Sequence, residues 1–238
     1  MGWLKKLVYF FSFLILLIFI AAIFAPTPEQ SNKQSTTPTT TVKAAVDLGT
    51  TNFKPGTYIF IWANGVERIS LGISGDCLYQ WVRRDGYSKQ FWIGYKIIDK
   101  NTIELNTNPT YILKYNKSID NYELIVKGKR NIADYTPDNS FADVEVYIFG
   151  KNDEGFRGGI YFSGELDIYT TRGNLKTQKI SGFTPKRFGI IDSVSSIDVY
   201  VKRTSSQGTI YVIVFDPATG KVLNYDSTRN DLYLTAYT

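Results

Sequence analysis

Apolar residues occur in two patterns along this chain: one continuous block near the N-terminus and many short alternating runs after residue 46. The block, residues 7–25, contains no charged residue. At about 1.5 Å per residue, a helix of this length spans roughly 28 Å, close to the ~30 Å hydrocarbon thickness of a bilayer. Residues 1–25 are therefore predicted to form a cytoplasmic tip followed by a single transmembrane helix.

A cleaved signal peptide is the alternative for this block. An uncleaved anchor is favoured because the run exceeds the ~7–15 residues of a signal-peptide core. In addition, Pro26 follows Ala25, the only plausible cleavage site. Lys5 and Lys6 precede the helix, whereas its other side is neutral until Glu29, and positive charge is retained in the cytoplasm. We expect a single-pass cell-membrane protein with its N-terminus in the cytoplasm and its C-terminal domain outside.

Residues 26–45 are rich in threonine and proline and contain no aromatic residue. Such a segment cannot bury enough apolar surface to offset the entropy lost on ordering, which predicts a disordered stalk. The composition is also typical of O-glycosylated stalks outside the cell, with an unmodified spacer as the alternative.

From residue 46 onward, short alternating runs separated by turn residues indicate β-strands. A polar, proline-containing segment at 131–140 separates two series of runs. We predict an all-β ectodomain of two small modules, a β-meander or barrel at 46–133 and a β-sandwich at 140–238, in preference to one large sandwich. The predicted strands are 58–62, 66–73, 78–82, 91–98, 102–105, 111–115, 122–126, 144–149, 160–162, 165–170, 197–201, 209–215 and 222–225.

The first series has a recurring rhythm. It includes GTY at 56–58, GYKIIDKNTIEL at 94–105, YILKY at 111–115 and YELIV at 122–126. Residues 54–130 resemble small lipocalin-like β-meander domains of secreted and membrane-anchored proteins, in which a Gly-x-Tyr-x-Ile … Asn-x-Ile pair of strands recurs. The resemblance implies an up-and-down barrel or half-barrel, a fold that sometimes holds a ligand inside, and it carries over no catalytic residue.

Composition excludes several kinds of chemistry. The chain has no histidine and one cysteine, which excludes Ser-His-Asp and Cys-His catalysis, His–metal sites, Cys clusters and an intramolecular disulfide. Cys77 is expected to be an inert core residue, with an intermolecular bridge as the alternative. Loop oxygen ligands near 134–139 and 152–154 lack EF-hand spacing, so no metal or other cofactor is predicted.

The net charge is +5, with the densest basic spots at 83–84 and 127–130. Nucleic-acid binding is not expected of a domain outside the cell. Basic residues there attract anionic lipid headgroups or wall polymers without specificity.

An acidic residue, an apolar residue and a tyrosine recur four times in the second series. Because side chains alternate along a strand, the acid and the tyrosine of each triplet share one face. Such a face can stack on sugar rings and accept hydrogen bonds from their hydroxyls. A solvated sheet face with cross-strand tyrosine pairs is the alternative. The candidate ligand face consists of Tyr147, Tyr169, Tyr200, Tyr233, Glu145, Asp167 and Asp198.

Carboxylate pairs are the remaining route to general acid–base catalysis. Asp143 with Glu145, and Glu165 with Asp167, are each spaced to lie about 6.5–7 Å apart on one strand face, between the separations of retaining and inverting glycosidases. Any wet strand with acids two residues apart has the same spacing, so no catalytic residue is predicted. A hydrolase of envelope polysaccharide is kept as the alternative function.

Aromatic residues in the first module offer a second place for a ligand. Trp62, Trp81 and Trp92 are expected in the barrel core, with a ligand cavity lined by them as the alternative. Asn116 begins the Asn-Lys-Ser sequon in a predicted hairpin loop and is a candidate glycosylation site.

These features together predict a membrane-anchored, extracytoplasmic, non-enzymatic binding or envelope-interaction module. Its expected partners are the membrane and a cell-envelope glycan or protein.

Overall fold

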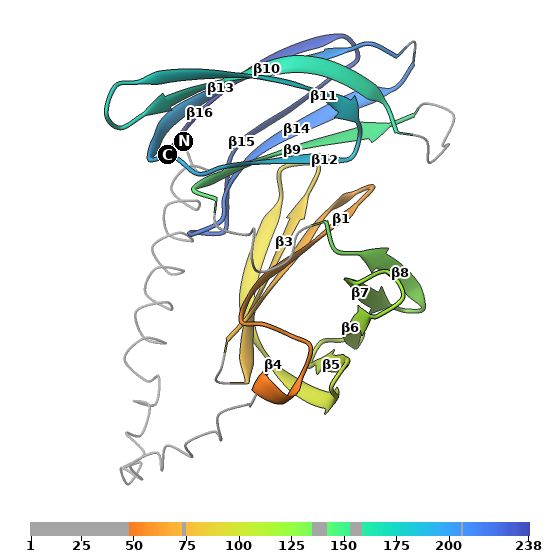
Figure 1. Cartoon of the computed structure of the whole chain (residues 1–238). Coiled ribbons are helices and arrows are strands. Elements are labelled where there is room, and N and C mark those ends of the chain that lie inside the picture. Colours follow the sequence, from red (N-terminus) through yellow and green to blue (C-terminus); the bar gives the residue numbers. More distant parts are fainter. Residues whose placement is uncertain (1–47, 73–74, 135–141, 153–158, 206) are drawn as a thin grey trace, which may run out of the picture. The chain divides into compact units, whose positions relative to one another are not determined.

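The computed structural model describes residues 48–72, 75–134, 142–152, 159–205 and 207–238 (Figure 1). The predicted transmembrane helix at 1–25 and the predicted stalk at 26–45 lie outside these residues. Within the described ranges, no helix has the length and apolar content needed to cross a membrane. Apart from a short 3-10 turn, η1, the described elements are strands, which confirms the all-β prediction.

The strands form one eight-stranded sheet and two four-stranded sheets. The turn η1 is Leu48–Thr50, and the eight-stranded sheet is β1 (Gly56–Trp62), β2 (Gly65–Leu71), β3 (Asp76–Arg83), β4 (Ser88–Asp99), β5 (Thr102–Leu105), β6 (Tyr111–Asn116), β7 (Asn121–Val126) and β8 (Lys129–Ile132). The other strands are β9 (Val144–Lys151), β10 (Tyr161–Thr170), β11 (Leu175–Phe183), β12 (Lys186–Ile190), β13 (Val194–Arg203), β14 (Thr209–Asp216), β15 (Lys221–Thr228) and β16 (Asp231–Tyr237).

The eight-stranded sheet is an antiparallel meander in which each strand pairs with its neighbours in the sequence. Its last strand returns to its first. The Asn131 side chain donates to the Ile61 carbonyl at 2.8 Å, and just after β8 the Asp134 amide donates to the Ile59 carbonyl at 2.8 Å. The sheet therefore nearly closes into a barrel, the arrangement that the lipocalin-like resemblance implies.

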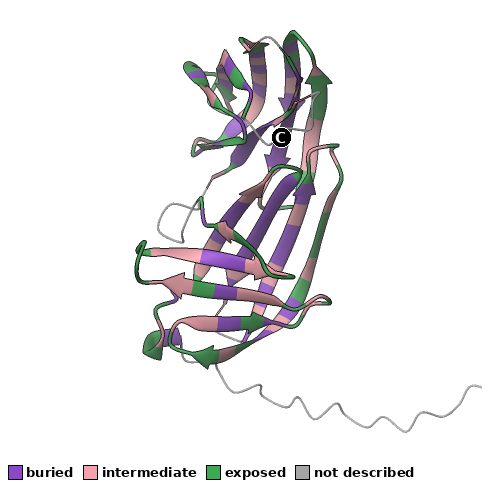
Figure 2. Cartoon of the chain, turned by 90° about the vertical axis from the view of Figure 1, so that its right-hand side faces the viewer, coloured by how far each residue is buried: buried purple, intermediate pink, exposed green. Residues whose placement is uncertain are grey.

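Buried positions are interspersed with more exposed ones along the meander strands (Figure 2). Side chains that alternate along a strand lie in turn in the barrel interior and on its outer wall. On β1, Tyr58 and Phe60 point into the interior, while Ile59 between them packs on the outer side. The interior is closely filled with apolar side chains, which include Ile69, Leu71, Cys77, Tyr79, Ile93, Ile103, Leu105, Leu113 and Leu124.

The second half of the chain is a sandwich of two stacked sheets, with strand orders β11-β10-β13-β16 and β12-β9-β14-β15 (Figure 1). Alternate residues of both sheets meet in a core that contains Phe162, Leu166, Val199 and Val212. The inward positions of β10 and β13 are buried, so the intervening positions are left for an outer face.

Strands β9 and β14 are buried on both faces, which explains their nearly continuous apolar sequences. One face contributes to the sandwich core, and on the other Tyr147, Phe149 and Phe215 pack against Ile59 and Val66 from the meander wall. The sheets divide on either side of the polar segment predicted as a boundary, but the described residues of both halves belong to one compact unit.

The structure contains four strands that were not among the strands expected from the sequence: β8, β11, β12 and β16. Each lies at an end of its sheet, where one backbone edge is unpaired with another strand of that sheet. Edge strands commonly carry charged side chains, and β8, β11 and β12 are rich in lysine and arginine. Apolar alternation is therefore too weak to mark these three strands, whereas β16 alternates and its start is recognised from the sequence only as the last acid-apolar-tyrosine triplet.

The buried thiol of Cys77 provides a direct test of whether the barrel interior excludes solvent. The side chain is fully buried, and burial, assisted by the charge of Asp76, raises the pKa of the thiol to about 12. Because the thiolate is the reactive form, an aromatic disulfide reagent at pH 8 should label the native chain at least about 100-fold more slowly than the denaturant-unfolded chain. Equal labelling rates would mean that Cys77 reaches solvent in the native protein.

Candidate functional site

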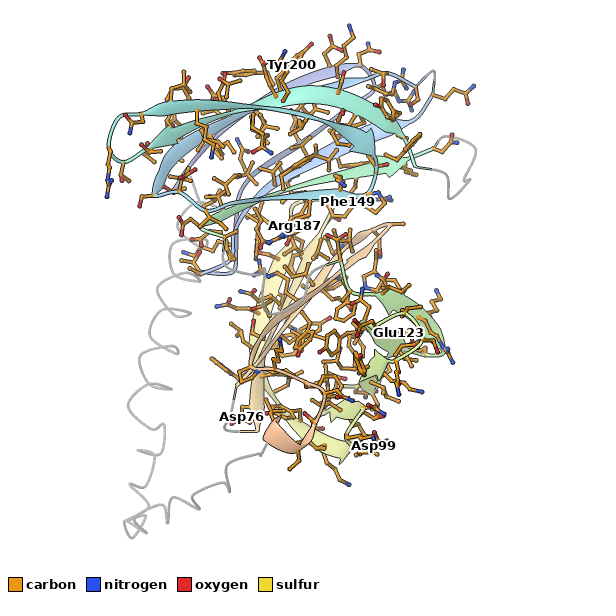
Figure 3. The ribbon with its side chains drawn as sticks, in the orientation of Figure 1. Asp76, Asp99, Glu123, Phe149, Arg187 and Tyr200 are labelled. Atoms are coloured by element: carbon orange, nitrogen blue, oxygen red, sulfur yellow. The ribbon has the colours of Figure 1, made fainter. Side chains whose placement is uncertain are left out.

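The outer face of the sheet β11-β10-β13-β16 carries five of the seven residues of the predicted ligand face. We call these residues, Tyr169, Tyr200, Tyr233, Asp167 and Asp198, the tyrosine–aspartate face. They occupy alternate positions, and the residues between them on β10, β13 and β16 are buried in the sandwich core. Figure 3 shows Tyr200 on this outer side of the sheet.

Strand register brings the members of the face next to one another. Tyr200 on β13 lies directly opposite Tyr233 on β16, and Asp198 lies opposite Asp167 on β10. Tyr233 and Tyr169 are accessible, with 64% and 37% of their surfaces exposed, and Tyr200 between the neighbouring strands is half-buried. On the outer surface of the sheet, the facing carboxylates of Asp167 and Asp198 therefore lie between the Tyr200–Tyr233 pair on one side and Tyr169 on the other.

The two aspartates face each other although like charges opposite one another destabilise a sheet. Each receives a hydroxyl hydrogen bond from the outer neighbouring strand. Thr177 on β11 donates to Asp167 at 2.5 Å, and Thr235 on β16 donates to Asp198 at 2.7 Å. These bonds reduce the repulsion and orient both carboxylates without consuming all their acceptor sites.

Asp198 also orders the tyrosines around it. Its hydrogen bond with Tyr233 raises the pKa of that hydroxyl, with smaller effects from partial burial and the charge of Asp198. Partial burial and then the negative charges of Asp198 and Asp167 raise the pKa of Tyr169. Both phenols therefore stay neutral at physiological pH, and the face presents aromatic rings and charged acceptors together.

Glu145 and Tyr147 do not belong to this face. They lie on β9, which pairs with β12 and β14 in the other sheet, and both are fully buried. The sheet topology therefore corrects the prediction of one exposed surface that contains all four triplets. The triplet of Glu145 and Tyr147 has the same local pattern, but it lies on a strand that is covered on both faces.

The buried Glu145 is instead the centre of an ion triad where the meander meets the sandwich. Its carboxylate accepts from Arg68 of β2 at 2.5 Å and from Arg187 of β12 at 2.6 Å. The Tyr147 hydroxyl donates to the same carboxylate, and the Arg68 guanidinium lies 5.4 Å from the centre of the Phe215 ring. Sequence reasoning missed both arginines because they lie 77 and 42 residues from Glu145.

The two carboxylate pairs have different surroundings. Glu145 of the first pair is held in the ion triad, which removes it from contact with solvent or substrate. Glu165 and Asp167 of the second pair share the outer face of β10, where Glu165 lies opposite Tyr200. The second pair is therefore part of the same open surface as the tyrosine–aspartate face.

The three tryptophans of the meander separate according to strand alternation. Trp62 and Trp81 face a cavity at one end of the barrel, whereas Trp92 points away from the interior and is 70% exposed. The expectation of an interior role fits the first two and is wrong for Trp92. Glu67 lines the same cavity and was not predicted from the sequence. An acidic residue at an inward-facing position of an alternating strand could have indicated it.

Asn116 ends β6 at the hairpin leading to β7, as expected for the sequon. Its side-chain nitrogen, the atom that glycosylation would modify, donates to Glu123 at 2.8 Å, while its oxygen accepts from the Ser118 amide. Glycosylation there remains a prediction. Across the described ranges, no group of three or more acidic or cysteine side chains is placed to hold a metal ion.

The described residues define an all-β protein in which a nearly closed eight-stranded meander packs against a two-sheet sandwich. The chain matches no known family model, and no curated protein or solved structure is significantly similar to it.

Proposed function

We propose that this chain is a membrane-anchored, extracytoplasmic, non-enzymatic binding protein whose tyrosine–aspartate face binds a polysaccharide of the cell envelope. The observation that carries the proposal is the cross-strand placement of Tyr200 beside Tyr233, next to the facing carboxylates of Asp167 and Asp198. The location outside the membrane rests on the N-terminal apolar block and the two lysines that precede it.

The chemistry of the face suits a sugar polymer. Exposed tyrosine rings offer flat apolar surfaces for the C–H faces of sugar rings, and their hydroxyls add polar contacts. The carboxylates retain lone pairs that can accept hydrogen bonds from sugar hydroxyls. Because the face is an open sheet surface, it favours an extended chain that contacts several residues in succession over a small molecule that must be enclosed.

Replacing both Tyr200 and Tyr233 by alanine is expected to weaken binding at least tenfold, because truncating a central aromatic contact costs about 1–2 kcal/mol and 1.4 kcal/mol corresponds to a factor of ten. The measurement is co-sedimentation of the full chain with purified peptidoglycan and cell-wall polysaccharides. A polyoxyethylene ether detergent should be used, since detergents with sugar headgroups would compete.

Tyr225→Ala is the matched control, because Tyr225 is 53% exposed but lies on β15 of the other sheet. This variant should bind as the unmodified chain does. Retention by none of the polymers, or equal retention of the double variant, contradicts the proposal.

The hydrolase alternative uses the pair Glu165 and Asp167 on the same face. It predicts that the full chain releases new reducing ends from a bound polymer and that Glu165→Gln abolishes the release. Binding without release supports the non-enzymatic proposal.

A further inference from the structure

The barrel contains a second chemically distinctive place, a cavity of about 250 Å³ at the end where the β1–β2 and β7–β8 hairpins lie. Inward-facing side chains from strands on opposite sides of the meander meet there. The cavity is lined by Trp62, Asn64, Glu67, Tyr79, Trp81, Tyr111, Val126 and Lys129. It belongs to the meander, whereas the tyrosine–aspartate face belongs to the sandwich.

Glu67 places a carboxylate inside this cavity although its side chain is almost completely buried. Trp62 Nε1 donates to one carboxylate oxygen at 2.8 Å, and the Tyr79 hydroxyl donates to the other at 2.9 Å. Tyr111 adds a further hydrogen bond. The carboxylate is therefore held in place by three aromatic residues from β1, β3 and β6.

These donors are all neutral, so they do not balance the charge of Glu67. Among the described residues, no lysine or arginine forms an ion pair with it. The ion pairs of that part of the chain join other residues. Buried carboxylates are usually paired with a cation, and Glu145 in the same protein has two. Lys129 also lines the cavity but forms no ion pair with Glu67, so the carboxylate remains available to a cation from outside the chain.

The lining of the cavity is suited to an organic cation. Tryptophan and tyrosine rings attract a cation placed over their faces, and the attraction increases where water is excluded. Trp62, Trp81, Tyr79 and Tyr111 supply such rings around one carboxylate. The volume is below the 300–1,000 Å³ common for drug-sized ligands, which restricts the occupant to a small molecule or a headgroup.

We propose that the cavity binds a small molecule or headgroup that carries an alkylammonium group, with the nitrogen beside the Glu67 carboxylate and the alkyl groups against Trp62 and Trp81. The site is independent of the polysaccharide-binding proposal, so either can fail without the other.

The charged and titratable groups around Glu67 predict how binding depends on pH. Burial raises the pKa of Glu67, and its hydrogen bonds oppose the rise in part. Tyr79 and Tyr111, whose pKa values are also raised by burial, remain neutral, and Lys129 from β8 is an exposed residue of the cavity lining. Because the cation binds the carboxylate form, affinity should increase as pH rises through the elevated pKa of Glu67.

The test is a tryptophan-fluorescence titration of the full chain carrying Trp92→Phe, which removes a tryptophan outside the cavity. The probes are choline, ethanolamine and 3,3-dimethylbutan-1-ol, a neutral molecule of the same shape as choline, in a polyoxyethylene ether detergent. Choline or ethanolamine should change the fluorescence saturably, and the neutral molecule should bind at least tenfold more weakly.

Glu67→Gln keeps the size of the side chain and removes its charge. It should weaken binding of the cation at least tenfold and abolish the pH dependence, whereas Glu104→Gln, at an exposed position of β5, should change neither. An unchanged thermal transition shows that Glu67→Gln is folded. If that variant unfolds, the comparison of choline with its neutral counterpart in the Trp92→Phe chain still tests whether the cavity selects a cation.

Vesicles distinguish a lipid headgroup from a free amine as the source of the ammonium. If phosphatidylcholine or phosphatidylethanolamine vesicles compete with choline and phosphatidylglycerol vesicles do not, the headgroup is the source. If none competes while choline binds, the ligand is a free amine.

Three results would each overturn the proposal. They are equal binding of choline and the neutral molecule, absence of saturable binding by both cations, and full binding by a folded Glu67→Gln variant.

Discussion

Replacing Glu145 by glutamine is expected to lower the free energy of unfolding by about 3–5 kcal/mol, because it leaves the charges of Arg68 and Arg187 buried without their counter-ion. Glutamine is almost the same size as glutamate, so the loss comes from charge and not from a cavity. Denaturant titration of the full chain, followed by circular dichroism, measures the effect.

An exposed ion pair in the same protein serves as the control. Lys176 and Asp192 lie 3.3 Å apart with both side chains accessible to solvent. Solvent screens such pairs, so Asp192→Asn should cost about 0–1 kcal/mol. A similarly small loss for Glu145→Gln would contradict the role assigned to the ion triad.

Removing all three charges together should cost less than removing Glu145 alone. The variant that combines Arg68→Met, Glu145→Leu and Arg187→Met replaces the triad by apolar groups of similar length and leaves no buried charge unpaired. If the triple variant is less stable than Glu145→Gln, the specific hydrogen bonds at the junction contribute more to stability than the pairing of the buried charges does.

The second large effect is expected from Phe162→Ala, with a loss of about 3–5 kcal/mol. The Phe162 side chain is fully buried between the two sheets of the sandwich, and its ring meets that of Phe188 edge to face at 6.3 Å. Truncation removes this contact and leaves a cavity that the rigid sheets cannot close. Denaturant titration again measures the change.

Phe183→Ala is the matched control for this substitution. Phe183 ends β11, is 65% exposed and contacts the ring of Tyr161 at the surface. Its truncation should change stability by no more than about 0.5 kcal/mol. Equal losses for the two phenylalanines would show that Phe162 does not occupy a tightly packed core.

Much of the fold could be predicted from sequence because most strands expose one face and bury the other. The run at 102–105 coincides with β5, and those at 111–115 and 209–215 match β6 and β14 within one residue. The runs at 160–162 and 165–170 prove to be one strand, β10, in which Ser163 and Gly164 interrupt the apolar pattern without ending it. Among the strands that were missed, β8 and β11 expose most of their side chains, and β12 is short and begins with two basic residues.

The candidate site was less predictable because it depends on sheet topology and on register. Tyr200 and Tyr233 become neighbours only because β13 pairs with β16, while Tyr147, in the same local pattern, is placed in the other sheet. A shift of one residue exchanges the faces of a strand. Trp92 points outward, but the residues on both sides of it are also apolar. The sequence therefore has no alternation at this position that could have indicated its direction.

The most direct test of the proposed binding face is hydroxyl-radical footprinting of the full chain on a retained cell-wall polysaccharide. The polymer is expected to slow side-chain oxidation of Tyr169, Tyr200 and Tyr233 and to leave that of Tyr225 on the other sheet unchanged. Unaltered oxidation of the three tyrosines while the chain is bound to the polymer would show that the tyrosine–aspartate face is not the binding surface.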